Sequence, residues 1–205
     1  MQRAEVPAAP PAAAAVEEER DLVQRARAGD AGAFEALVRR YQGWVFTLAL
    51  RMIGDRAEAE DMAQEVFLKA YRGLPAFRGA SRFSTWLYAI ASHHCLSYLQ
   101  ARSRRGGAFG RGRAAHEDDS RAAVDRIPDG APRADLLLER ADLSRTVQAE
   151  LAHLPEDHRL ILVLRDIQGL SYEEITRTLG LEPGTVRSRL HRARLAMKAR
   201  LCPQL

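Results

Sequence analysis

The spacing of apolar residues predicts a helical first half of the chain. Apolar side chains recur three or four positions apart from Phe34 to Met52 and again from Ala59 to Tyr71. A third such run follows a predicted N-cap at Ser84. Glycine-containing breaks separate the three runs. Residues 17–102 are therefore predicted to form a compact bundle of three helices.

Two segments lack this periodicity. Residues 103–134 hold several glycines, prolines and arginines together with a short acidic run, and they predict a flexible linker. The first 16 residues are rich in Ala and Pro and have no long apolar core, so we interpret them as a disordered tail and not as a signal peptide. The chain is thus predicted to have two separate folded parts.

Helical periodicity resumes in the second half, over residues 135–205. Apolar residues recur at Leu136, Leu143, Val147, Leu151 and Leu154, and a further helix is expected to begin at Pro155. The predicted fold class is therefore all-α: two small helical domains joined by a flexible linker.

The last 35 residues have the pattern of a helix-turn-helix. Ser171 is placed to cap a short helix, Gly180 suits a tight turn, and Pro183 suits the first turn of the next helix. One stripe of that last helix is apolar, formed by Val186, Leu190, Ala193 and Met197. The opposite side presents Arg187, Ser188, His191 and Arg192, with Gly184 and Thr185 at its N-terminal end. This arrangement predicts a recognition helix for the major groove, although an ordinary helical hairpin with a solvated basic face fits the same pattern.

Charge and composition indicate the kind of partner and the cellular compartment of the protein. The 205 residues carry a formal net charge of +4, which alone does not identify a polyanionic partner. Between Thr185 and Leu205, however, basic side chains occur without a single Asp or Glu, and such a local field suits phosphate contacts. Two widely separated cysteines favour a reducing cytoplasm, and no apolar stretch approaches the ~20 residues of a membrane span. We therefore expect a cytoplasmic protein without direct membrane insertion.

Two sets of motifs resemble a known family. The first set reads D-M-A-Q-E-V-F at 61–67, F-R-G at 77–79 and F-S-T-W-L-Y-A-I-A at 83–91. The second reads L-P-E-D-H-R at 154–159, L-R-D at 164–166, G-L-S-Y-E-E-I at 169–175 and P-G-T-V-R-S-R-L-H-R-A-R at 183–194. In this order they resemble region 2 and region 4 of the extracytoplasmic-function sigma factors of bacterial RNA polymerase. The joint occurrence of both sets is far more specific than either alone.

The resemblance implies a polymerase-docking face in the first half. The family's second region 2 helix docks on the clamp coiled coil of core RNA polymerase, and here its outer face offers Asp61, Gln64, Glu65 and Leu68. Carboxylates around an apolar contact suit a basic partner helix. The alternative is a merely solvated polar face.

The resemblance also implies capture of the unpaired minus-ten strand by a loop and the helix that follows it. The candidate residues are Phe77, Arg78, Ser81, Phe83, Ser84, Thr85, Trp86, His93 and Arg102. Unpaired bases are held by stacking and by hydrogen bonds to their edges. The helical spacing of Phe83 and Trp86 nevertheless favours a place in the core over base stacking. His93, Ser97 and Gln100 stand where the family commonly has Asn, an acidic residue and Arg, which leaves minus-ten specificity open.

The implied partners follow from the same resemblance. Region 4 is expected to read the minus-35 element and to contact the polymerase flap, and a cognate anti-sigma factor is expected to occlude both polymerase-binding surfaces. A linker of about 30 residues can stretch to ~100 Å, and elements about 25 base pairs apart lie ~85 Å apart. The linker can therefore span the two elements when polymerase holds it extended.

Two other classes of function are alternatives to this interpretation. A stand-alone helix-turn-helix regulator would act without polymerase and would need a dimerisation surface or effector pocket in the first half. An enzyme using Ser92, His93 or His94 lacks a glycine elbow, a phosphate loop or a paired carboxylate cleft. Neighbouring residues on a helix point about 100° apart, so the His93-His94-Cys95 run cannot chelate one metal ion. We expect no metal, no cofactor and no catalytic residues.

Overall fold

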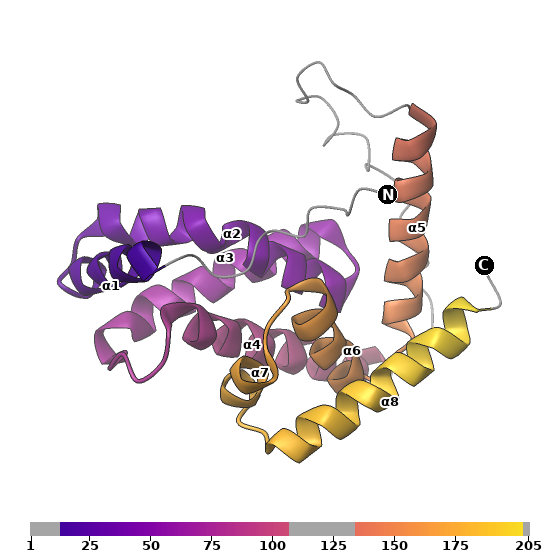
Figure 1. Ribbon diagram of the computed structural model, residues 1–205. Coiled ribbons are helices and arrows are strands. Elements are labelled where there is room, and N and C mark those ends of the chain that lie inside the picture. Colours follow the sequence, from indigo (N-terminus) through magenta and orange to yellow (C-terminus); the bar gives the residue numbers. More distant parts are fainter. Residues whose placement is uncertain (1–12, 107–133, 203–205) are drawn as a thin grey trace.

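The computed structural model describes residues 13–106 and 134–202 and confirms the predicted all-α class. The described residues form helices and connecting turns, with no strand among them. They make two bundles, which we call the first bundle (α1–α4) and the second bundle (α5–α8) (Figure 1). The predicted linker lies largely outside the described residues.

The first bundle contains four helices: α1 Ala13–Arg27, α2 Ala31–Ile53, α3 Arg56–Gly73 and α4 Phe83–Gly106, with a 3₁₀ turn at Leu74–Ala76. Most of its core comes from the apolar stripes predicted for α2 and α3 and from Leu87 of α4, and Leu37, Leu48, Val66 and Leu87 are buried there. The carboxylates of Asp30 and Asp55 accept backbone N–H bonds at the starts of α2 and α3. These caps fix where the two helices begin.

Three boundaries differ from the sequence-based expectation. The three predicted helices are preceded by α1, which packs on α2 and is separated from it by Gly29, at φ 98°, and the Asp30 cap. Helix α4 begins at Phe83, so Ser84 lies inside it and is not the cap. The predicted tail (1–16) and linker (103–134) overlap the first turn of α1 and the last turn of α4.

The second bundle contains α5 Ala134–Ala152, α6 Glu156–Leu162, α7 Tyr172–Leu179 and α8 Pro183–Leu201, with a π-helical turn at Val163–Ile167 after α6. Ser171 caps α7 as predicted: its hydroxyl accepts from Glu174 N–H, while the Glu174 carboxylate accepts from Ser171 N–H. Gly180 ends α7 at φ 63°, a conformation that favours glycine. Leu143, which the periodicity placed on the apolar stripe of α5, is 54% exposed.

The two bundles are in direct contact. Helices α2 and α4 of the first bundle meet α5, α6 and α7 of the second (Figure 1). Helix α8 runs along the outside of the second bundle, packed mainly on α6. Helix α8, the predicted recognition helix, thus keeps one side open to solvent.

Candidate nucleic-acid and protein interfaces

The apolar stripe of α8 is buried and its opposite side is exposed. Val186, Leu190, Ala193 and Met197 all belong to the core of the second bundle. Of the six predicted contact residues, Gly184, Arg187, Ser188, His191 and Arg192 are exposed and Thr185 is half-buried. The structure therefore brings these six residues together on one accessible side, as a groove-reading helix requires.

The basic residues of α8 fall into two groups. Arg189 donates to Asp157 of α6 at 2.9 Å, and Arg194 donates two hydrogen bonds to Asp166. Hydrogen bonding to Asp166 raises the pKa of Arg194. Both arginines are thus held against their own bundle, whereas Arg187 and Arg192 extend from the outer side of the helix. The sequence alone predicts that all of these basic residues contribute to one positive field.

The predicted docking face of α3 is exposed throughout. Asp61, Gln64 and Glu65 are exposed, and Leu68, one helical turn further along α3, is 55% exposed. Tyr71 is also exposed, its ring in edge contact with Phe34. The sequence pattern had placed Tyr71 on the buried side, so this apolar extension of the docking face was missed.

A histidine links this face to α4. His94 Nε2 donates to Glu65 at 2.5 Å, and Lys69 Nζ donates to His94 Nδ1 at 2.7 Å. The Glu65 carboxylate is therefore held by a neutral ring whose proton lies on Nε2. The pattern of apolar positions gives no signal for such a polar connection.

The aromatic residues of the loop and of α4 divide into buried and accessible rings. Phe77 and Phe83 are buried, as is Thr85, and Phe83 lies in the core that its helical spacing favoured. Trp86 is half-buried, with its ring centroid 4.8 Å from that of Phe77 and 5.7 Å from that of Phe83. Trp86 is thus the ring of this cluster with an accessible side. Arg78 is exposed, and Ser81 and Ser84 are half-buried.

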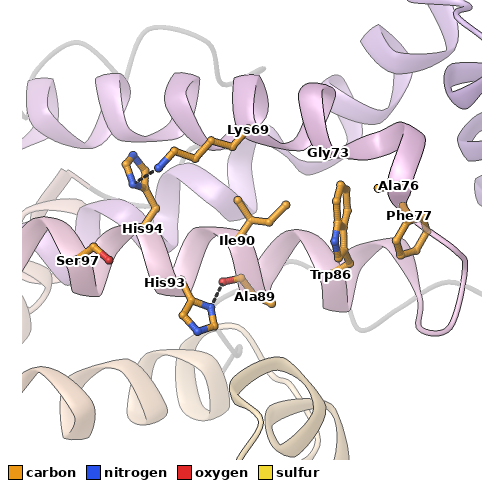
Figure 2. A pocket seen from close by; sticks show the side chains of 10 residues that line it. All are labelled: Lys69, Gly73, Ala76, Phe77, Trp86, Ala89, Ile90, His93, His94 and Ser97. Carbon is orange, nitrogen blue, oxygen red and sulfur yellow. Dashed lines mark hydrogen bonds between the residues drawn. The ribbon is translucent and has the colours of Figure 1, made fainter.

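Trp86 borders a groove of about 560 Å³ between α3 and α4 (Figure 2). A Cβ at Gly73 would lie 3.2 Å from the indole ring, so glycine lets Trp86 pack closely at one end of the groove. Ile90, His93, His94, Lys69 and Ser97 line the remainder. Trp86, Ala76 and Phe77 lie at one end of the groove, and Lys69, His94 and Ser97 lie at the other (Figure 2).

His93 is exposed and its ring orientation is fixed. Its Nδ1 lies 2.8 Å from the backbone carbonyl of Ala89, and because a carbonyl only accepts, Nδ1 carries the proton (Figure 2). In the neutral ring, Nε2 is therefore an acceptor. At the end of α4, Arg102, Arg104 and Arg105 are all exposed, and Arg102 also donates to Glu58 at 2.7 Å.

The described residues contain neither a metal-binding cluster nor a membrane-spanning helix. Within residues 13–106 and 134–202, no group of three or more His, Cys, Asp or Glu side chains is arranged to hold a metal ion. No helix in that part of the chain has the length and apolar character needed to cross a membrane.

Comparisons with known proteins identify the family. Residues 37–105 match the family Sigma-70 region 2, and residues 144–197 match Sigma-70, region 4. The chain is 40% identical over 189 residues to the RNA polymerase sigma-H factor of Pseudomonas aeruginosa strain PAO1, covering 92% of this chain and 96% of that protein. It is also 40% identical over 183 residues to the ECF RNA polymerase sigma-E factor of Escherichia coli K12, covering 89% and 93%.

Solved structures agree with these sequence matches. The structure of CnrH in complex with the cytosolic domain of CnrY superposes with a TM-score of 0.64 at 26% identity, over 92% of this chain and 99% of that one. The sigma factor RpoE in complex with the anti-sigma factor NepR from Bartonella quintana gives 0.61 at 23% identity, over 82% and 96%, which supports the fold. The chain belongs to the extracytoplasmic-function family of RNA polymerase sigma factors.

Proposed function

We propose that this sigma factor binds core RNA polymerase through α3 and reads two promoter elements with its two bundles. The observation that carries the proposal is the separation of exposed surfaces. The carboxylates and Leu68 lie on α3, and the basic recognition side lies on α8. Acidic groups around an apolar contact suit a basic protein partner, and exposed arginines suit DNA phosphates and guanine edges.

The groove beside Trp86 suits an unpaired base of the minus-ten element. An accessible indole provides a stacking surface, and Nε2 of His93 provides an acceptor at the edge of the same groove. An acceptor selects base edges that carry an N–H donor. The proposed chemistry is binding and strand separation, with no catalytic step performed by this chain.

Two further properties follow from the proposed activity. The chain acts where core polymerase works, in the cytoplasm. It is also a candidate for control by an anti-sigma factor, because RpoE of Bartonella quintana is solved in complex with one. In this proposal the anti-sigma factor covers both polymerase-binding surfaces.

The test compares DNA binding with and without core polymerase. Purified chain, bacterial core polymerase and a pool of genomic DNA fragments are combined, and the retained fragments are sequenced. We expect enrichment of fragments sharing two spaced motifs only when chain and polymerase are both present. Equal enrichment by the chain alone would favour the stand-alone regulator and would contradict the proposal.

A further inference from the structure

The docking face of α3 holds the two carboxylates of this helix that have no cationic partner. Glu58 and Glu60 are each paired with an arginine, at nitrogen–oxygen distances of 2.7 and 3.0 Å. Within the described part of the chain, neither Asp61 nor Glu65 forms an ion pair with a lysine or an arginine. Like charges four positions apart destabilise a helix, so this pair does not serve the stability of α3. Its negative charge is available to a basic partner.

Lys69 has the spacing to neutralise Glu65 but does not pair with it. The two residues are four positions apart on α3 with the acid first, which is the order that favours an ion pair on a helix. Glu35 and Arg39 of α2 have the same order and spacing, and they do form such a pair. Lys69 donates instead to His94 Nδ1 at 2.7 Å. The neutralisation that the sequence of α3 favours is thus absent from the structure.

The ring of His94 lies between the two charges. Figure 2 shows the ring reaching from α4 to the Lys69 ammonium. Its other nitrogen, Nε2, donates to the Glu65 carboxylate at 2.5 Å. An ammonium can only donate, so Nδ1 is unprotonated and the ring is neutral. His94 therefore gives Glu65 a hydrogen-bond donor without cancelling its charge, and it keeps the ammonium on the opposite side of the ring.

The packing of α4 on α3 holds the ring in place. The His94 side chain is 14% exposed, whereas the Glu65 side chain is 60% exposed. The two helices are neighbours in the first bundle, and the ring forms part of the wall of the groove between them. The histidine is thus fixed by the fold, while the carboxylate that it holds remains accessible.

We propose that His94 is a positioning residue for polymerase docking, which holds Lys69 apart from Glu65 and so keeps the docking face of α3 acidic. The proposal rests on the proposed binding of core polymerase through α3, and it adds a residue of α4 that acts through Glu65. The hydrogen bond from Nε2 also restrains the carboxylate before docking. Less side-chain freedom is then lost when the partner binds.

The test measures the affinity of the full chain for bacterial core polymerase in a cycle of variants at positions 69 and 94. In His94→Ala, Lys69 loses its acceptor and pairs with Glu65. We expect the Kd for core polymerase to rise about threefold, which is the change typical of a surface ion pair. In a Lys69→Gln background no cation is left to compete, so adding His94→Ala should leave the Kd nearly unchanged.

Two further variants separate positioning from a general effect on the fold. His94→Gln retains one donor and one acceptor in its amide, and we expect it to keep the affinity of the wild type. His153→Ala removes an exposed histidine of the second bundle and is the matched control, with no change in Kd expected. Circular dichroism verifies that each variant is folded.

Nitrogen-15 NMR of the free chain tests the protonation of the ring without polymerase. The protonated and unprotonated nitrogens of a neutral imidazole have different chemical shifts. We expect Nε2 of His94 to carry the proton and Nδ1 to be unprotonated at neutral pH, as the two hydrogen bonds require. A ring protonated on both nitrogens, or on Nδ1 alone, would overturn the proposal.

The binding results distinguish this inference from the proposed function. A rise in Kd that requires Lys69 and is absent in His94→Gln would support the positioning role. An equal rise in both Lys69 backgrounds, or no rise in either, would overturn that role and leave polymerase binding intact. A wild-type chain with no affinity for core polymerase would overturn the proposed function, and the inference with it.

Discussion

At the scale of single residues, the arginines of α8 divide into those that pair with carboxylates of their own bundle and those that do not. Arg189 and Arg194 are paired with Asp157 and Asp166, so their charge is directed at their own bundle. Arg187 is exposed on the recognition side of α8. Sequence alone predicted the face but could not make this distinction, because the acidic partners lie about 30 positions away along the chain.

Replacing Arg187 by Ala is expected to reduce discrimination of the minus-35 element by about tenfold or more, the loss typical of a direct base contact. Arg194→Ala is the matched control and should leave discrimination intact, since its partner is Asp166. Competition binding of the holoenzyme to intact and mutated promoters measures both. Equal losses in the two variants would contradict the assigned roles.

The hydrogen-bonding role of His93 could not be predicted from the sequence. The pattern marked it as a departure from the family's usual Asn, which left its contribution undefined. The bond to Ala89 O fixes which ring nitrogen accepts, and that information comes from the helix geometry and not from the motif.

At the scale of elements, caps and turns were predictable because they depend on residues close together in sequence. Ser171 and Glu174 were both in place for a capping box, and the αL end at Gly180 followed from glycine's freedom. Helix α4 begins at Phe83, two residues before the start that a cap at Ser84 predicts. The exposure of Tyr71 was missed because helical spacing alone does not tell which neighbour covers a face.

The cap of α7 supports the turn that orients the recognition helix. Ser171→Ala removes the acceptor for Glu174 N–H and should lower the free energy of unfolding by about 1 kcal/mol. Ser97→Ala, an exposed position within α4, should change it by less than about 0.5 kcal/mol. Urea unfolding followed by circular dichroism compares them. A Ser171→Ala variant as stable as wild type would show that the capping box does not contribute to the free energy of unfolding.

Helix α3 is the second element with an assigned surface. Asp61→Ala combined with Glu65→Ala should weaken binding to core polymerase by about tenfold, because two carboxylates facing a basic partner are lost. Glu17→Ala with Glu35→Ala removes the same charge from α1 and α2 and should have little effect. Titration of labelled protein with core polymerase gives both affinities. A stronger effect of the second pair would place the docking face elsewhere.

At the scale of the whole molecule, the division into two helical parts was predictable, whereas their contact was not. Apolar periodicity indicates which faces are buried but not which bundle covers them. Gln148, Arg159 and Gln168 are polar and bond to atoms about 100 positions away, so no local pattern marks them.

The most direct test is run-off transcription on genomic DNA with core polymerase, with and without this chain. The account predicts discrete transcripts that appear only when the chain is added, and whose start sites lie downstream of a shared pair of spaced motifs. Transcripts that are unchanged by the chain, or that start without any shared motif, would contradict it.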